Sequence, residues 1–159
     1  MSLAKGLELL AHRPDFQLLV TLPRIGQPTA AAILTAIGDI GAYTHGKQLV
    51  KLAGLDSRLF ASGSSLRHLP QLSHAGSASL RYWLSHSAKR LVAHAPHCRA
   101  YSQRRKQQSP GKGAGQRALV AVADKVIRMI YRILTAKEAY TPQKDQRIAQ
   151  DDAAQRKAA

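Results

Sequence analysis

A long apolar stripe towards the C-terminal end most strongly limits the folds available to this chain. Seven apolar residues recur there every three or four positions, namely Leu119, Val122, Ala123, Val126, Ile127, Ile130 and Leu134. This spacing is the period of one face of an α-helix, and Lys125, Arg128 and Arg132 fall on its other side. The sequence therefore predicts an amphipathic helix here, within a helical bundle over residues 77–136.

Proline and glycine divide the rest of the chain into shorter segments with the same helical spacing. The apolar face that contains Phe16 and Leu19 must end at Pro23, because the residue before a proline is disfavoured in the α conformation. Almost no segment has the strict alternation of a half-buried strand. We therefore expect a mainly α, compact helical domain. Further helices are expected at Ala4–His12, after Pro28, at Gly46–Ala53, around Trp83 with Ser77 as N-cap and an end before Pro96, and at His97–Gln108.

Residues 54–76 interrupt the helical pattern with the sequence GLDSRLFASGSSLRHLPQLSHAG. The segment is rich in serine and glycine and contains Pro70, so we expect a short irregular hairpin around Leu59–Phe60 and Leu69–Leu72. At the two ends of the chain, residues 1–15 are expected to be the remnant of a linker helix and residues 137–159 a flexible polar tail.

The charge of the chain indicates a polyanionic partner. Its 24 Lys and Arg exceed its 9 Asp and Glu, which gives 159 residues a net charge of +15 and a pI near 10.7. The excess lies in residues 1–136, and no acidic residue falls between Arg99 and Arg117. Such a surface attracts nucleic acid and releases its counterions. A solubilising surface and a ribosome-like RNA binder are the alternatives.

Composition excludes several classes of function. Aromatic residues make up only 5%, which argues against a single-strand binder built on stacked rings. The one cysteine, Cys98, excludes an internal disulfide framework and a cysteine-based zinc site. No apolar run reaches the length of a membrane span, and the N-terminus lacks the apolar region of a signal peptide. We expect a soluble, cytoplasmic protein with no membrane partner.

The first candidate binding site is the sequence from Leu22 to Pro28. Two short helices joined by a Pro-x-hydrophobic-Gly turn are typical of a helix-hairpin-helix, in which exposed N–H groups and a helix N-terminus hold a DNA phosphate. The usual turn reads Pro-Gly-Ile-Gly, and here Arg24 replaces the first glycine and adds a charge near the same phosphate. An ordinary pair of helices with no ligand is the alternative. The candidate residues are Arg24, Ile25, Gly26 and Thr29.

The second candidate site is a serine cluster within residues 54–76. Basic side chains around a serine on a non-helical turn would neutralise a phosphate under attack and help to ionise the hydroxyl. A connecting loop with no chemistry is the alternative. The cluster comprises Ser62, Ser64 and Ser65 around Gly63, with Arg58, Arg67, His68 and His74 nearby.

Other patterns in the sequence predict no chemistry. The nine acidic residues are scattered and form no evident two-metal cluster. His94, His97 and Cys98 are metal-ligand types, but Pro96 interrupts them and no fourth ligand is evident. We therefore expect no metal ligand in this chain.

Four segments, taken in order, resemble a known family. They are LPRIGQPTAAAILTAIGDI, KQLVKLAGLDSRLFASG, LSHAGSASLRYWL and QRALVAVADKVIRMIYRIL. Together they are similar to the C-terminal transposase domain of the insertion-sequence transposases related to Piv DNA invertases. The resemblance covers residues 16–136, with the helix-hairpin-helix at 16–37, the serine loop at 54–76 and the bundle at 77–136. It implies a DNA transposase or site-specific recombinase that is associated with the nucleoid of a prokaryote.

The resemblance also implies that Ser62 is the nucleophile of strand exchange. The family's loop reads approximately Gly-Leu-x-Pro and, a few residues later, Ser-Gly, which correspond here to Gly54–Asp56 and Ser62–Gly63. Ser57 stands where the proline is expected, and Ser73–Ser77 replaces a more basic stretch. The residues expected to contact DNA are Arg24, Ile25, Gly26, Thr29, Arg58, Gly63, Arg67, Arg81, Arg104, Arg105, Lys106 and Lys112.

Full-length members of this family pair the domain with an N-terminal RuvC-like domain that bears an Asp-Glu-Asp-Asp metal site. The resemblance thus implies Mg²⁺ in that domain, no cofactor in this chain, and a bridging guide RNA as a further partner. We expect a truncated member or one piece of a split gene, which assembles with itself or with a RuvC-like domain and is inactive alone. The alternatives are a non-catalytic helix-hairpin-helix module that binds DNA or RNA and a regulator of a full-length transposase.

Overall fold

The structure of the chain is a computed structural model that describes residues 3–55 and 76–143. These ranges contain seven α-helices, one 3-10 turn and no strand, which confirms the expected mainly α fold. The expected hairpin around Leu59–Phe60 and Leu69–Leu72 lies outside the described residues. The helices are α1 (Leu3–Ala11), α2 (Pro14–Val20), α3 (Gln27–Ile37), α4 (Gly46–Leu52), α5 (Ala78–His94), α6 (Pro96–Gln108) and α7 (Ala114–Ala136), and the 3-10 turn is Ile40–Ala42.

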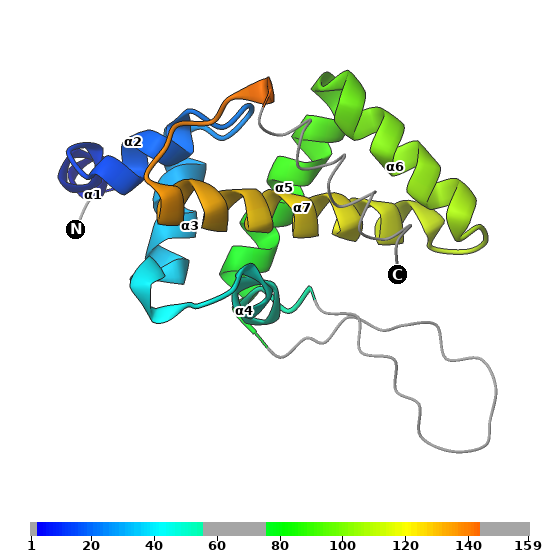
Figure 1. The fold of residues 1–159 in the computed structure, drawn as a ribbon, viewed down its shortest axis with the longest axis horizontal. Coiled ribbons are helices and arrows are strands. Elements are labelled where there is room, and N and C mark those ends of the chain that lie inside the picture. Colours follow the sequence, from blue (N-terminus) through cyan, green and yellow to red (C-terminus); the bar gives the residue numbers. More distant parts are fainter. Residues whose placement is uncertain (1–2, 56–75, 144–159) are drawn as a thin grey trace, which may run out of the picture.

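The helix α7 is the one on which most of the others pack (Figure 1). It runs across the molecule from α6 towards α1, α2 and α3, and it contacts α2, α4, α5, α6 and the 3-10 turn. The predicted apolar stripe is confirmed with a small shift, because Ala118 and Ile133 are also buried and Leu119 is only half-buried at its edge. Burial of this stripe is the main apolar contact that joins the helices.

Side chains from five helices meet in one core. The apolar face of α7 packs there against α2 and α4, and α5 packs against both α3 and α7. Such close packing leaves each helix little freedom to shift against α7. The largest fully buried side chains are Leu19, Ile33, Leu49, Leu80, Leu84, Ile127, Ile130 and Leu134.

Helix ends follow local signals in the sequence. The Ser77 hydroxyl accepts a hydrogen bond from the Leu80 N–H at 3.2 Å, so the predicted N-cap of α5 is confirmed. Pro14 and Pro96 open α2 and α6, where a missing N–H is tolerated. The predicted ends before Pro23 and Pro96 are also confirmed, at Val20 and His94.

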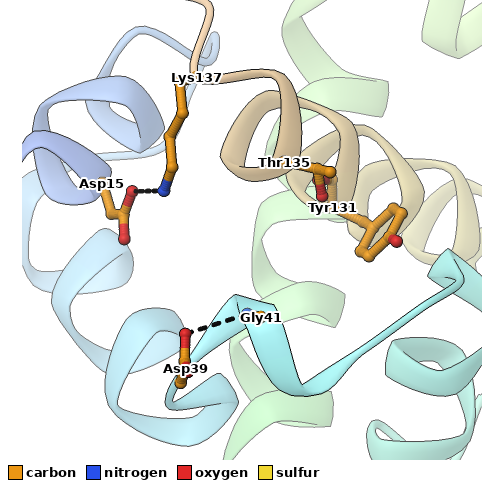
Figure 2. A network of polar contacts seen from close by, with 6 residues as sticks. All are labelled: Asp15, Asp39, Gly41, Tyr131, Thr135 and Lys137. Carbon is orange, nitrogen blue, oxygen red and sulfur yellow. Dashed lines mark hydrogen bonds and ion pairs between the residues drawn. The ribbon is translucent and has the colours of Figure 1, made fainter.

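The residues after α7 are held against α2. Lys137 ends α7 in the left-handed conformation with φ of 55°, and its ammonium group lies 2.6 Å from the Asp15 carboxylate (Figure 2). Three residues later the Tyr140 N–H donates to the Thr21 hydroxyl at 3.0 Å. Lys137 and Tyr140, in the first part of the expected flexible tail, are therefore in contact with the domain.

The N-terminal helix α1 packs against the rest of the domain. The expected boundary between residues 15 and 16 lies within α2, which begins at Pro14. Leu7 and Leu10 of α1 are half-buried and pack against the core. The helix expected to be a linker remnant thus contributes to the packing of the domain.

The connection between α3 and α4 is fixed by hydrogen bonds within it and by one hydrogen bond from α7. The Asp39 carboxylate accepts the Gly41 N–H at 3.0 Å (Figure 2), and the Tyr43 hydroxyl donates to the Ile37 carbonyl at 2.8 Å. From α7, the Tyr131 hydroxyl donates to the Tyr43 carbonyl at 3.4 Å. These contacts determine where α4 begins and therefore where residues 53–55, which follow it, lie.

Candidate functional site

The segment that contains the serine cluster starts and ends at one place in the fold. The Ser77 N–H donates to the Leu52 carbonyl at 2.7 Å, so the start of α5 is bonded directly to the end of α4. On the other side, the Leu55 N–H donates to the Val50 carbonyl at 3.1 Å. We call residues 52–55 and 76–81 the loop base. The described residues on either side of residues 56–75 therefore lie close together in the fold.

Gly76 makes this contact between α4 and α5 possible. Its φ is +152°, a conformation that side-chain-bearing residues rarely adopt. A Cβ at this position would lie 2.5 Å from the Leu52 carbonyl oxygen and 2.8 Å from the Gly54 nitrogen. Because both neighbours are backbone atoms, no side chain fits here without separating the two helices.

The side chain of Arg81 in α5 joins the two parts of the loop base by a hydrogen bond. Its guanidinium donates to the Ala53 carbonyl at 3.2 Å, and the side chain is half-buried. Ala53 and Leu55 are themselves buried in the core. Arg81, which was expected to contact DNA, therefore uses at least one N–H to hold the loop base. Ser62, Arg58, Gly63 and Arg67 lie outside the described residues.

The turn between α2 and α3 has an exposed charged residue, Arg24, next to a buried apolar residue, Ile25. Arg24 is exposed and has φ of +64°, so its backbone adopts the left-handed conformation that glycine favours. The neighbouring Ile25 is only 4% exposed, and its N–H donates to the Leu22 carbonyl at 3.3 Å. Thr29, in the first turn of α3, is buried as well. Of the four residues expected to bind DNA here, only Arg24 and Gly26 are exposed.

The α2–α3 turn lies close to the first half of α6. A small cleft of about 40 Å³ separates the α2–α3 turn from α6, and α7 forms its floor. The turn contributes Leu22, Pro23 and Ile25 to this cleft, and α6 contributes Cys98 and Tyr101. The cleft is lined mainly by apolar side chains, so the turn and α6 are held together by packing.

The six basic residues from Arg99 to Arg117 divide into two groups. Arg117 donates to the Lys112, Ser109 and Pro110 carbonyls at 2.9, 2.8 and 3.3 Å, which fixes the connection between α6 and α7. Arg99 donates to the Val92 and Ala93 carbonyls at the end of α5. The other four are exposed and form what we call the α6 basic surface: Arg104, Arg105, Lys106 and Lys112.

The polar side of α7 carries less available charge than the sequence suggests. The Arg128 guanidinium is paired with the Asp124 carboxylate at 2.9 Å. The Lys125 ammonium lies 4.6 Å from the centre of the Tyr101 ring, within cation–π distance. Arg132 is the exposed member of this group. Basic groups of α7 are thus used mainly in contacts within the domain.

One exposed aromatic group on α5 was not anticipated. Tyr82 is 62% exposed and lies edge-to-face against Trp83, with ring centres 5.3 Å apart. Trp83 is half-buried. The signal was present in the sequence, since Tyr82 and His86 are one helical turn apart and outside the apolar stripe of Leu80, Leu84 and Leu91.

The described residues show neither a metal centre nor a membrane span. In residues 3–55 and 76–143, no group of three or more His, Cys, Asp or Glu side chains is placed to hold a metal ion. No helix in the same ranges is long and apolar enough to cross a membrane.

The left-handed backbone of Arg24 leads to a stability prediction. We expect Arg24→Gly to be more stable than Arg24→Ala by about 1 kcal/mol. An L-residue in this conformation is strained by about 1–2 kcal/mol, and glycine relieves that strain. Part of this gain is lost because glycine also raises the conformational entropy of the unfolded chain. Both variants lose the same charge, so their comparison isolates the backbone. Urea denaturation measures the difference, and equal stabilities would show that the turn is not strained at this position.

Comparisons with known proteins agree with the resemblance seen in the sequence. The chain is 29% identical over 126 residues to the transposase for insertion sequence element IS1111A from Coxiella burnetii, and this covers 79% of the chain and 34% of that transposase. It is likewise 29% identical over 126 residues to the pilin gene-inverting protein of Moraxella bovis, which covers 79% of the chain and 38% of that protein. The chain thus spans little more than a third of the length of these relatives.

A family model gives the same result over the part of the chain that holds the loop base and the α2–α3 turn. Residues 16–103 match the model of the Transposase IS116/IS110/IS902 family. The matched range includes α2 to most of α6 and the whole of residues 56–75. Since this is more than half of the 159 residues, the chain belongs to the Transposase IS116/IS110/IS902 family.

Proposed function

We propose that this chain is the domain of a DNA transposase or site-specific recombinase that binds DNA and supplies Ser62 as the nucleophile of strand exchange. The observation that carries the proposal is the family match across residues 16–103, which includes the α2–α3 turn, the loop base and the serine segment between its ends. Both relatives named above rearrange DNA according to their names, a transposase and a pilin gene-inverting protein.

The proposed chemistry is a reversible phosphoryl transfer to serine. The Ser62 hydroxyl loses its proton to a base, and its oxygen attacks the scissile phosphorus. The bond from phosphorus to the leaving deoxyribose oxygen breaks, and that oxygen takes up a proton. The phosphoserine link keeps the energy of the broken bond, so a hydroxyl of another strand can attack it and rejoin DNA without a nucleotide cofactor. Arg58 and Arg67 would stabilise the negative charge on the phosphate.

The loop base supports this role for residues 56–75. A nucleophile must be held near its target to react efficiently, and fixed loop ends limit where the loop can reach. Hydrogen bonds from Ser77 and Arg81 to Leu52 and Ala53 fix these ends. The same ends are connected through α4 and α5 to the core on α7. The two ends of the segment that carries Ser62 are thereby fixed relative to the rest of the domain.

DNA binding is proposed to use the α2–α3 turn and the α6 basic surface together. Gly26 at the N-cap of α3 has no side chain to bond the N–H groups of Gln27 and Thr29, which leaves these two for a phosphate oxygen. Pro28 between them has no N–H. Arg24 is exposed beside Gly26. The turn faces the first half of α6 across the small cleft, and the α6 basic surface lies further along that helix and in the connection to α7. We expect one duplex to span both. The contacts are to the DNA backbone and carry no direct sequence information.

The partners of the domain are also part of the proposal. A RuvC-like domain would supply Mg²⁺, and a guide RNA would select the target. Assembly with such a domain or with a second copy of the chain is required for strand exchange in this account. A non-catalytic binding module and a regulator of a longer transposase remain the alternatives if Ser62 proves unreactive.

Neutralising the α6 basic surface should weaken duplex binding in proportion to the charges removed. We expect Arg104→Gln, Arg105→Gln and Lys106→Gln each to lower duplex affinity and to reduce the slope of log affinity against log salt by about 1 for each phosphate that the variant no longer neutralises. Lys5→Gln removes one exposed charge from α1 and is the control. Fluorescence anisotropy across a salt series measures both quantities. If Lys5→Gln weakens binding as much as the α6 variants, the net charge of the chain, and not the α6 basic surface, determines the affinity for the duplex.

The role of Ser62 is tested by covalent capture. The chain is mixed with labelled DNA that carries the element's end, with a family RuvC-like domain, guide RNA and Mg²⁺, and the products are separated on a denaturing gel. We expect a protein–DNA adduct that Ser62→Ala abolishes without changing DNA affinity. Ser64→Ala, two positions away, should keep the adduct. An adduct that survives in Ser62→Ala would assign the nucleophile elsewhere.

A further inference from the structure

We propose that Tyr82 is a stacking site for one unpaired base of single-stranded DNA. This inference deepens the proposed function and rests on it, because it names the form of DNA that lies next to the loop base. Tyr82 is 62% exposed, and it is the most exposed aromatic residue in the described ranges. An exposed aromatic ring on a strongly basic domain is available to the face of a nucleobase.

The Tyr82 ring is held in position by its neighbours. Its centre lies 5.3 Å from that of Trp83 at an angle of 82° and 6.4 Å from that of His86 at 22°. Trp83 and His86 also contact each other edge-to-face at 6.2 Å. Both neighbours are half-buried, so they join the exposed ring to the body of the domain. A base that stacks on a fixed ring loses less free energy to ordering that ring.

Positive charges follow Tyr82 along the same face of α5. Lys89 and Arg90 lie two helical turns after Tyr82, and both are exposed. Leu84 and Ala88 face the core on the opposite side. The helix contains no acidic residue that would repel a phosphate. This arrangement suits a single strand of nucleic acid: one base stacks on the ring, and the cations neutralise the phosphates that follow it.

The position of Tyr82 connects it to the serine segment. It follows Arg81, whose guanidinium holds the Ala53 carbonyl in the loop base. A base on Tyr82 would therefore lie at the helix position directly after the loop base, to which the segment that carries Ser62 is joined. Strand exchange requires bases to leave their original partners, so unpaired DNA arises in this reaction. Both named relatives act on DNA, which favours DNA over RNA as the occupant.

The low aromatic content of the chain is compatible with this proposal. A protein that coats a single strand needs a row of rings, and 5% aromatic residues argues against that. A site for one base needs a single exposed ring with support beneath it. Tyr82, Trp83 and His86 supply this within one turn of α5.

The test compares Tyr82→Ala with Tyr82→Phe on four labelled probes. The probes are single-stranded oligothymidylate, the same strand with abasic sites, single-stranded oligouridylate, and a duplex, all read by fluorescence anisotropy. We expect Tyr82→Ala to weaken oligothymidylate binding about fivefold or more, while Tyr82→Phe keeps it. Neither variant should change binding of the abasic strand or the duplex. Quenching of Trp83, the one tryptophan in the chain, should accompany binding of oligothymidylate to the wild type.

The outcomes separate this inference from the proposed function. Equal binding of oligothymidylate by wild type and Tyr82→Ala overturns the stacking site, even where duplex binding stays intact. An equal loss on the abasic strand overturns it too, because the ring would then act without a base. Tighter Tyr82-dependent binding of oligouridylate than of oligothymidylate would overturn the choice of DNA. Failure of the wild-type chain to bind any of these probes would contradict the proposed function as well.

Discussion

The burial of the apolar face of α7 is the interaction on which the rest of this domain depends. Ile127, Ile130 and Leu134 are almost fully removed from water, and α2, α4, α5 and α6 all contact the helix that carries them. Short helices such as α2 and α4 have little stability of their own, since isolated helices of this length are marginal in water. Their positions are therefore set by tertiary packing on α7.

The packing of α4 and α5 on the same helix fixes the ends of the serine segment. Because α4 and α5 both pack on α7, the end of one and the start of the other have fixed positions, and Gly76 lets their backbones meet. The serine segment thus leaves and re-enters a rigid body at one place. The α2–α3 turn and α6 are joined through the same core, so the loop base and the candidate DNA-binding regions belong to one packed unit.

Much of the fold could be predicted from local signals in the sequence. The helix ends before Pro23 and Pro96 and the N-cap at Ser77 depend on neighbouring residues alone, and all three are confirmed. Burial of Ile25 could not be predicted in this way, because it depends on α6 and α7 meeting the turn.

The candidate site could be predicted only in part, for a similar reason. Arg99 and Arg117 have the same charge in the sequence as Arg104, but the carbonyl groups that bind the first two come together only in the folded chain. The N-cap at Ser77 could be predicted locally, whereas the close approach of the neighbouring Gly76 to Leu52 arises only when the end of α4 meets the start of α5. Exposure of Tyr82 likewise depends on which face of α5 the core covers.

Amide hydrogen exchange of Ser77 and Leu55 tests the central claim of this account most directly. If the loop base is a rigid part of the domain, these two amides, which donate to the Leu52 and Val50 carbonyls, exchange as slowly as the core amides of Ile127 and Ile130 in α7. Exchange at the rate of an exposed, unbonded amide would contradict the account. The serine segment would then lack the fixed ends that the proposed mechanism requires.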